Sequence, residues 1–530
     1  MHKRIRTLAV RLMLVSGIST LTYSCKKDLK ADPSGNGGSG TGGSTTALSA
    51  EDSLKYLMYN IMQVSYGDGG RNKSAGLPTY YWYTSVATIN PLDGKYTTAD
   101  DLLTAMKGYA VNPDTKSPYD RYSFLDRTGA LTNKLINGVS ATTTVAATNG
   151  DIGLEYAPVL DANNNLRIFI LYADKNSPAG QAGVTRGWEI TSINGSSNFQ
   201  NTTAWLTQAY NSILNSASVT LGFKLPGGAT KTLTLNQGTY NVNPVAFDSV
   251  LTMGTSKVGY FVMYTFSSVI NSSGQATYTK TAIDNAFSKF KAAGINNLVI
   301  DLRYNGGGAV TTAEYLDSLI APSTAAGKVM YNYKYNDVMQ ANAAQIGLET
   351  VVNFPSTLGG LTLSSNNVFF ITSRNTASAS ELTLNNLRPY MNVHVVGDTT
   401  YGKPVGFIDF NISMYDSTHT KKYLADLYAI NFATTNANNS GGYFTGIAPD
   451  ANALATDYVN VPWGDATNDP NLIAIAKFLS VGNFRSAVNA RTESLGITGF
   501  SPLKGSASVE ANFNGMVDYK LSKKIQQLKK

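Results

Sequence analysis

Apolar residues in the first part of the chain recur at helical spacing. Leu54, Leu57 and Ile61 lie three or four positions apart, so a helix would carry them on one face. Residues 98–109 repeat this spacing and place two acids in the first turn, where they favour a helix N-terminus. The pattern predicts a small helical region over residues 49–145.

Short apolar runs bounded by turn residues replace this pattern over residues 150–240. The segments 166–173, 217–228 and 230–237 have the length and the β-branched or aromatic content of strands. The dipeptide Asn194–Gly195 is typical of a tight turn between strands. These signals predict a small β-rich module.

Buried strands and amphipathic helices alternate from about residue 250 onward. The pattern predicts strands at 258–266, 296–304, 366–373 and 392–398, and helices at 281–294, 311–322 and 381–390. This alternation is typical of helices packed on a sheet. We therefore expect a mixed α/β (α+β) domain over residues 250–480, followed by a poorly patterned, basic C-terminal tail over 481–530.

The composition favours an exported protein over a nucleic-acid binder. The chain has 530 residues, enough for several domains, and 43% of them are apolar. Only 15% are charged, the net charge is +7, and the basic residues cluster at the two ends. Because no basic stripe with interleaved aromatic residues lies between those ends, nucleic-acid binding is not expected.

The N-terminus has the pattern of a secretory signal. A basic start is followed by an apolar stretch that is too short and too interrupted to span a membrane. Cys25, the only cysteine, stands where a bacterial lipoprotein signal is cut and acylated, although Leu21 lies four places before it rather than three. We predict a signal peptide with a lipobox-like cysteine over residues 1–25. A plain secretory signal is the alternative, and a buried core thiol fits this position poorly.

Residues 26–48 form a Gly/Ser-rich linker that would let a globular body stand off a membrane. An acylated Cys25 would carry lipid chains sufficient for stable anchoring. These features predict a periplasmic or cell-surface lipoprotein of a Gram-negative-type envelope, which contacts the membrane through its lipid anchor.

Small hydroxyl residues cluster between the predicted strand 366–373 and the predicted helix 381–390. Free N–H groups at a helix N-terminus favour negative charge, so a nucleophilic hydroxyl there would find a site for the oxyanion it generates. Ser378 and Glu381 also have the spacing of a capping box, which requires no catalysis. The stretch taken alone leaves both interpretations open.

A nucleophilic serine requires a base, and histidines are scarce in this chain. Of the three, His2 would leave with the signal, His394 lies inside a predicted strand and His419 lies in an exposed turn. Lysine can also act as the base when burial lowers its pKa. Lys403, in a glycine-bearing loop after the strand 392–398, is the candidate, and a solvated surface lysine is the alternative.

The order and spacing of these motifs resemble those of the C-terminal processing, or tail-specific, serine proteases. The segment TASASE (376–381) contains Ser378, and the lysine of YGK (401–403) follows 25 residues later. The resemblance implies that Ser378 is the nucleophile, that Lys403 is the base and that Glu381 is an acid of the same catalytic motif. It places a Ser-Lys protease domain over residues 250–480.

The same resemblance implies an oxyanion hole. The segment VIDLRYNGGG (299–308) matches the strand and glycine loop of the family, with Gly307 or Gly308 as one donor and the Ala379 N–H as the other. A triple glycine taken alone also fits an anion-binding turn. One position departs from the family pattern. Many members carry glutamine four residues after the lysine, and this chain has Phe407, which leaves open how the base is held.

Residues 150–240 resemble a PDZ domain of the bacterial protease type. The matching residues are Ser177, Pro178, Ala179, Ala182, Gly183, Val184, Gly187, Ile190, Ile193, Asn194 and Gly195. Trp188 stands where an aspartate is usual. PDZ domains bind extended peptides, often free C-termini, by strand addition, which implies peptide binding at Gly153 and Leu154. A structural spacer is the alternative.

Together the resemblances imply an exported serine endopeptidase, a hydrolase with a crotonase/ClpP-like protease core, a PDZ domain and a small N-terminal helical region. Its expected partners are protein or peptide substrates with accessible C-termini. The sequence contains no metal-ligand cluster, Walker loop or dinucleotide fingerprint, so neither a metal nor a cofactor is expected. The alternatives are a catalytically inactive peptide-binding lipoprotein, which Phe407 motivates, and a histidine-dependent esterase.

Overall fold

The computed structural model of the chain describes residues 48–67, 89–109, 111, 116–140, 151–363, 366–416, 418–453, 459–484, 501–502 and 515–521. The predicted signal peptide with Cys25 lies outside the described residues, as does all but the last residue of the predicted linker. Within the described part, no helix combines the length and the apolar character that crossing a membrane requires.

A five-stranded sheet lies at the base of the core. The strands, in sheet order, are β16 (Asn392–Gly397), β15 (Asn367–Thr372), β11 (Asn297–Asp301), β10 (Ser256–Met263) and β9 (Val245–Met253). All neighbours are parallel except β9, which is antiparallel to β10. The parallel strands are mostly buried apolar runs, as expected of strands covered on both faces. The four strands predicted in this part of the chain are confirmed.

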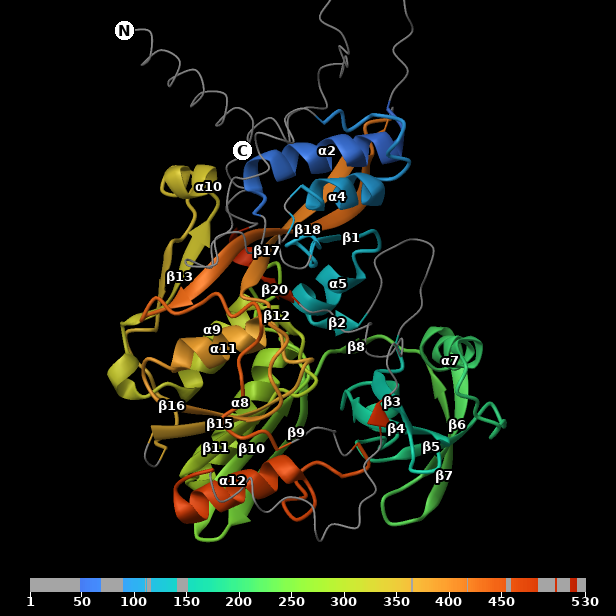
Figure 1. The fold of residues 1–530 in the computed structure, drawn as a ribbon, viewed down its shortest axis with the longest axis vertical. Coiled ribbons are helices and arrows are strands. Elements are labelled where there is room, and N and C mark those ends of the chain that lie inside the picture. Colours follow the sequence, from blue (N-terminus) through green and yellow to red (C-terminus); the bar gives the residue numbers. More distant parts are fainter. Residues whose placement is uncertain are drawn as a thin grey trace, which may run out of the picture.

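Helices cover both faces of this sheet (Figure 1). On one face lie α8 (Tyr278–Ala293), α9 (Val310–Ile320) and α11 (Ala379–Leu387), which contribute to the largest apolar core. On the other face lies α12 (Pro470–Val481). The predicted stop of α8 is confirmed, because Gly294 ends the helix with a φ of 60°, which glycine adopts without a Cβ penalty.

A second sheet, above α9 and α11 in Figure 1, collects strands from distant parts of the chain. The strands, in sheet order, are β12 (Gly307–Ala309), β20 (Gly515–Val517), β17 (Val405–Tyr415), β18 (Lys421–Asn436), β13 (Val329–Tyr335) and β14 (Val351–Asn353). The strand β1 (Phe124–Asp126) also pairs with β18. Residues 515–521 of the predicted C-terminal tail therefore belong to this core.

The N-terminal region packs on the second sheet through two amphipathic helices. α2 (Ala50–Ser65) starts at its Ser49 cap and buries Leu54 against β17 and β18, and α4 (Ala99–Lys107) starts at a capping box. Both predicted helices are confirmed. The smaller elements are α5 (Ala130–Thr132), a π-helical turn (Asn133–Asn137), β2 (Val139–Ser140), β8 (Tyr240–Asn241), a 3-10 turn (Ser323–Ala325) and α10 (Asp337–Asn342).

The β-rich module has a sheet of its own, at the lower right in Figure 1. The strands, in sheet order, are β19 (Ser501–Pro502), β3 (Leu154–Leu160), β4 (Leu166–Ala173), β5 (Glu189–Ile193), β6 (Ser218–Lys224) and β7 (Thr230–Asn236). Its helices are α6 (Pro178–Gln181) and α7 (Thr203–Tyr210), with a π-helical turn over Asn211–Asn215. Arg186 fixes the module to the core, because its guanidinium stacks 4.5 Å from the centre of the Trp463 ring and donates to the Val461 carbonyl at 2.9 Å.

Candidate active site

Three loops meet at one edge of the five-stranded sheet. They follow β11, β15 and β16, three adjacent parallel strands whose carboxyl ends lie side by side. The loop after β11 holds the three glycines 306–308, the loop after β15 holds Ser378, and the loop after β16 holds Lys403. Ligands of open α/β sheets bind at this edge. The fold thus brings together the three groups of candidate residues that the sequence spreads over a hundred positions.

Ser378 stands at the turn between β15 and α11 in a conformation that few residues adopt. Its φ is 60° and its ψ is −107°, a combination that strains any residue with a Cβ. The Oγ atom is buried and has no hydrogen-bond partner among the described residues. A serine that only capped the helix would use this oxygen to accept a helical N–H. The predicted capping box is present, because the Glu381 carboxylate accepts the Ser378 N–H, and the strained turn with its buried Oγ favours a reactive hydroxyl in addition to this cap.

Glu381 fastens the serine turn to the lysine loop. Its Oε2 atom accepts hydrogen bonds from the backbone N–H groups of Ser378 and Lys403, both at 2.8 Å. Its Oε1 atom accepts from the Gly402 N–H at 2.8 Å and from the Thr400 hydroxyl at 2.5 Å. Burial raises the pKa of the carboxyl, and the four hydrogen bonds oppose that rise. Because both of its oxygens hold the two loops, Glu381 has the geometry of a positioning residue rather than of a catalytic acid.

Lys403 is completely buried beside two aromatic rings. Its Nζ lies 3.7 Å from the centre of the Phe407 ring and 4.9 Å from that of Tyr122. Burial holds the pKa of the amine well below its usual range, although the negative charges of Asp120 and Glu381 oppose this shift. A lysine held in this way supplies the neutral amine that a general base requires. The alternative of a solvated surface lysine is wrong.

Replacing Phe407 with leucine should move the pH dependence of activity toward lower pH. The ring face next to Nζ stabilises the ammonium form by about 1–2 kcal/mol, so its loss lowers the pKa of Lys403 further. Because the neutral amine is the active form, the acid limb of a plot of kcat/KM against pH shifts to lower pH together with this pKa. Phe223→Leu, which truncates a buried ring in the β-rich module, is the control. An unshifted limb in Phe407→Leu would contradict the assignment of Lys403 as base.

Asn305 fixes the glycine loop beside the helix N-terminus. Its Oδ1 atom accepts the Gly307 N–H at 2.9 Å, and Gly308 lies in the β12–β20 ladder. Ala379 provides the first N–H of α11, a position without an intrahelical acceptor. A Cβ on Gly307 would come within 2.9 Å of the Ala379 nitrogen, so this approach requires glycine. Ala379 and the glycine loop therefore face each other, and the N–H of Gly307 is already engaged by Asn305.

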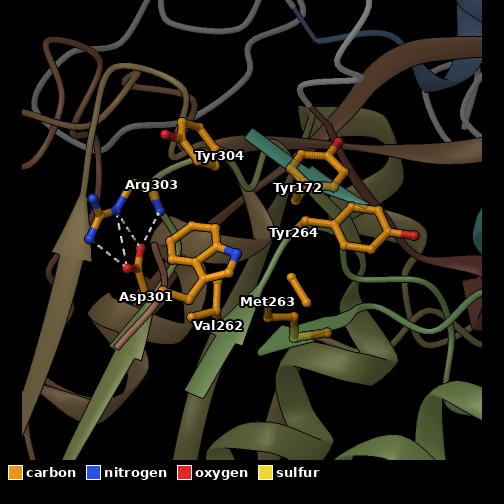
Figure 2. Close-up of a pocket in the computed structure, with 9 residues that line it drawn as sticks. Tyr172, Val262, Met263, Tyr264, Asp301, Arg303 and Tyr304 are labelled. Atoms are coloured by element: carbon orange, nitrogen blue, oxygen red, sulfur yellow. Dashed lines mark hydrogen bonds and ion pairs between the residues drawn. The ribbon is translucent and has the colours of Figure 1, made fainter. Parts of the chain in front are cut away.

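The pocket in Figure 2 lies beside the start of the glycine loop and holds a buried ion-pair cluster. Arg303 contacts Asp301 at 2.7 Å, as Figure 2 shows, and also reaches Asp469 at 2.7 Å. The lining contains neither Ser378 nor Lys403, and its charged groups neutralise one another. This cluster braces the end of β11 and the loop that follows it.

The two histidines among the described residues, His394 and His419, lie outside the three loops that hold the candidate site. His394 stacks on Phe369 with ring centres 5.0 Å apart, and burial lowers its pKa. His419 is exposed in the turn between β17 and β18. Neither has a contact with Ser378 in the described part of the chain, which leaves the histidine-dependent esterase without structural support.

The two residues predicted to grip a peptide carboxylate are buried in the β-rich module. The Gly153 N–H donates to the Asp151 carboxylate at 2.8 Å, and a Cβ on Gly153 would collide with Ser177. Leu154 is 5% exposed and starts β3. In this structure the Gly153 N–H is committed within the protein, so a carboxylate would have to displace Asp151.

Sequence reasoning missed residues whose roles depend on contacts far along the chain. Tyr122 comes from the N-terminal region, and its hydroxyl donates to the Gly402 carbonyl at 2.9 Å in the lysine loop. Thr400 holds Glu381. Of these residues, only Asn305 could have been recognised from the sequence around it. An asparagine before a glycine turn commonly accepts a hydrogen bond from the backbone N–H two residues later, as Asn305 does from Gly307.

Residues 257–453 match the sequence model described as peptidase family S41. The chain carries a family S41 peptidase domain. The matched range contains the glycine loop, Ser378 and Lys403. The S41 domain makes the protein a serine-type protease, and its mixed α/β fold agrees with the predicted fold class.

A solved structure with a TM-score above 0.5 shares the fold of this chain. A Bacteroides fragilis protein assigned to the S41 proteases is 21% identical, with a TM-score of 0.56 over 80% of this chain and 96% of that chain. A photosystem II D1 C-terminal processing protease is 17% identical, with a TM-score of 0.41 over 83% of this chain and 99% of that chain. No curated protein matches the chain by sequence.

Proposed function

We propose that the protein is an endopeptidase that cleaves protein or peptide substrates with a Ser378–Lys403 dyad. One observation carries the proposal. The Oγ of Ser378 is buried in a strained turn, and a single carboxylate oxygen of Glu381 holds the Ser378 backbone next to that of Lys403. A nucleophile and a base on two loops need such a link to keep their geometry.

The reaction follows from these groups. Ser378 Oγ attacks the scissile carbonyl carbon while neutral Lys403 Nζ takes the hydroxyl proton, and the carbonyl electron pair moves to the oxygen. The Ala379 N–H and the Gly308 N–H stabilise the resulting oxyanion, since Asn305 already engages the N–H of Gly307. When this intermediate collapses, the C–N bond breaks and the lysine returns the proton to the leaving amine. Water then hydrolyses the acyl-enzyme, with Lys403 again as the base.

A fluorophosphonate probe tests this proposal directly. We expect covalent labelling of the full-length protein at Ser378, no labelling of Ser378→Ala, and cleavage of denatured casein only by the protein that labels. Ser267→Ala, which removes another buried hydroxyl of the core, is the matched control and should label normally. A folded protein that neither labels nor cleaves would instead support the inactive peptide-binding alternative, which Phe407 motivates.

Export and anchoring form a separate part of the proposal and rest on the sequence. The basic and apolar start, Cys25 and the Gly/Ser-rich linker support a lipoprotein of a Gram-negative-type envelope, placed in the periplasm or on the cell surface. Incorporation of labelled palmitate, lost in Cys25→Ser, tests it. Export of an unlabelled protein would support the plain secretory signal.

We also propose that the β-rich module is a PDZ domain that docks the C-terminal tail of a substrate. The SPA and AGV segments and the exposed Asn194–Gly195 turn support it, together with the sheet-edge position of β3, which only the short β19 covers in the described residues. Cleavage rates of substrates that differ only in an apolar or a charged C-terminus test docking. Equal rates would support the structural spacer.

A further inference from the structure

The chain's own residues 515–521 lie in the active-site region. β20 (Gly515–Val517) lies between β12 and β17, where Figure 1 labels it, and is parallel to both. It pairs Gly515 with Gly307. On one side the Gly515 N–H donates to the Gly306 carbonyl at 2.9 Å. On the other side the Asp518 N–H donates to the Phe407 carbonyl at 3.0 Å. One short strand thus bridges the glycine loop and the residue whose ring covers Lys403.

The Gly515 carbonyl lies next to the proposed oxyanion hole. A Cβ built on Gly307 would meet the Gly515 oxygen at 2.5 Å, the Ala379 nitrogen at 2.9 Å and the Ala377 oxygen at 3.0 Å. These atoms therefore surround one small volume beside Ser378. A substrate carbonyl attacked by Ser378 would direct its oxygen at the Ala379 N–H, which is one of these atoms.

β20 also fills apolar space on both sides of the strand. Met516 and Val517 point to opposite faces and are both 0% exposed. Met516 belongs to the core below the second sheet, and Val517 to the core shared with the N-terminal helices. In the same structure Ser378 and Lys403 are also 0% exposed, so a substrate can reach them only after some covering segment moves.

The residues after β20 are attached by one buried polar contact and by one ion pair that is partly exposed. The Tyr333 hydroxyl donates to the Asp518 carboxylate, and Lys520 forms an ion pair with Glu314 of α9. The Lys520 side chain is 36% exposed, which makes this the attachment that a substitution can weaken with least damage to the core.

We infer that the groove between β12 and β17 is the substrate-strand site of the protease and that residues 515–521 occupy it as a built-in competitor. This inference rests on the proposed function. The groove accepts an extended peptide by main-chain pairing, with a small residue in the place of Gly515 followed by two apolar residues in the places of Met516 and Val517. Substrates of that class must displace the strand before Ser378 can react.

The test uses the full chain with Lys520→Glu, which sets a like charge beside Glu314 and loosens the strand. We expect at least a tenfold faster reaction of Ser378 with a fluorophosphonate probe. A synthetic peptide of residues 514–521 in excess should restore the slow rate, and the same peptide with Met516→Asp should not. Lys224→Glu, an equal charge change on the exposed end of β6, should label like the parent protein.

Three results would overturn the inference. One is an unchanged labelling rate in a Lys520→Glu protein with normal thermal unfolding. The second is a loss of folding on this surface substitution, which would make β20 a permanent strand. The third is failure of the 514–521 peptide, carrying a fluorophore, to bind the loosened protein. Peptide binding without any labelling of Ser378, even in the loosened protein, would keep the groove and refute only the proposed catalysis.

Discussion

Lys403→Met should abolish most of the activity and make the protein more stable. The general base contributes about 10²–10⁴-fold to such reactions, so kcat should fall by that factor. Methionine removes an amine that is wholly buried at a cost in desolvation, and we expect a gain of about 1–3 kcal/mol in the free energy of unfolding. Casein cleavage and urea unfolding at neutral pH measure the two effects.

The gain in stability should depend on pH. Burial lowers the pKa of Lys403 in the folded state, so between that pKa and the usual lysine value the unfolded chain binds a proton that the folded chain lacks. Stability of the parent protein therefore rises with pH in this window, and the advantage of Lys403→Met is largest below it and fades toward pH 10.5. A constant advantage at all pH values would contradict a depressed lysine pKa.

A second buried lysine provides the matched control. Lys55 is 5% exposed, and its Nζ donates to the Tyr96 carbonyl at 2.9 Å and pairs with Asp52 at 2.8 Å. Lys55→Met removes these partners and should destabilise the protein while leaving kcat intact. If both substitutions lowered the free energy of unfolding alike, the claim that burial of the Lys403 amine destabilises the folded protein would be wrong.

Glu381→Gln should be the most damaging single substitution at the site. A carboxamide replaces one acceptor oxygen of Glu381 with an NH₂ group, which is a donor. Two of the four hydrogen bonds are therefore lost, and the NH₂ group faces the two groups that donated them. We expect the free energy of unfolding to fall by about 3–5 kcal/mol. Below the unfolding temperature, kcat should fall while KM changes little, because the loops that hold the nucleophile and the base separate.

Asp317→Asn tests whether any buried carboxyl would behave in this way. Asp317 is fully buried in α9, burial raises its pKa, and Asn386 donates to its Oδ2 at 2.9 Å. Because burial favours the neutral form of this carboxyl, a neutral amide of the same shape should cost little. Normal kcat in Glu381→Gln would contradict the positioning role.

Much of the site was predictable because its signals are local. Each of the three loops follows a buried apolar strand that the pattern predicts, and the family resemblance assigned the glycines, Ser378 and Lys403 to one site. The adjacent, parallel order of those strands, which brings their loops to one edge, is known only from the structure. The burial of Lys403 was not predictable from its neighbours in sequence. Its aromatic cover comes in part from Tyr122, which reaches it only because the N-terminal helices pack on the second sheet.

The second sheet was not predicted from the sequence, because its strands come from distant parts of the chain. β20 has only three residues, and nothing in their pattern distinguishes a strand from a loop. Its strand conformation depends on pairing with β12 and β17, which lie far earlier in the chain. Glu381 was assigned to the catalytic motif by resemblance, and only the four donors around its oxygens reveal what it holds.

The late position of β20 also sets the order of assembly during translation. β12 and β17 emerge from the ribosome well before residue 515, and until then each presents unpaired main-chain groups at the gap between them. Parallel pairing across such a long separation is intrinsically slow. The nascent protein therefore has an interval in which this gap is open to a chaperone or to a peptide supplied from outside.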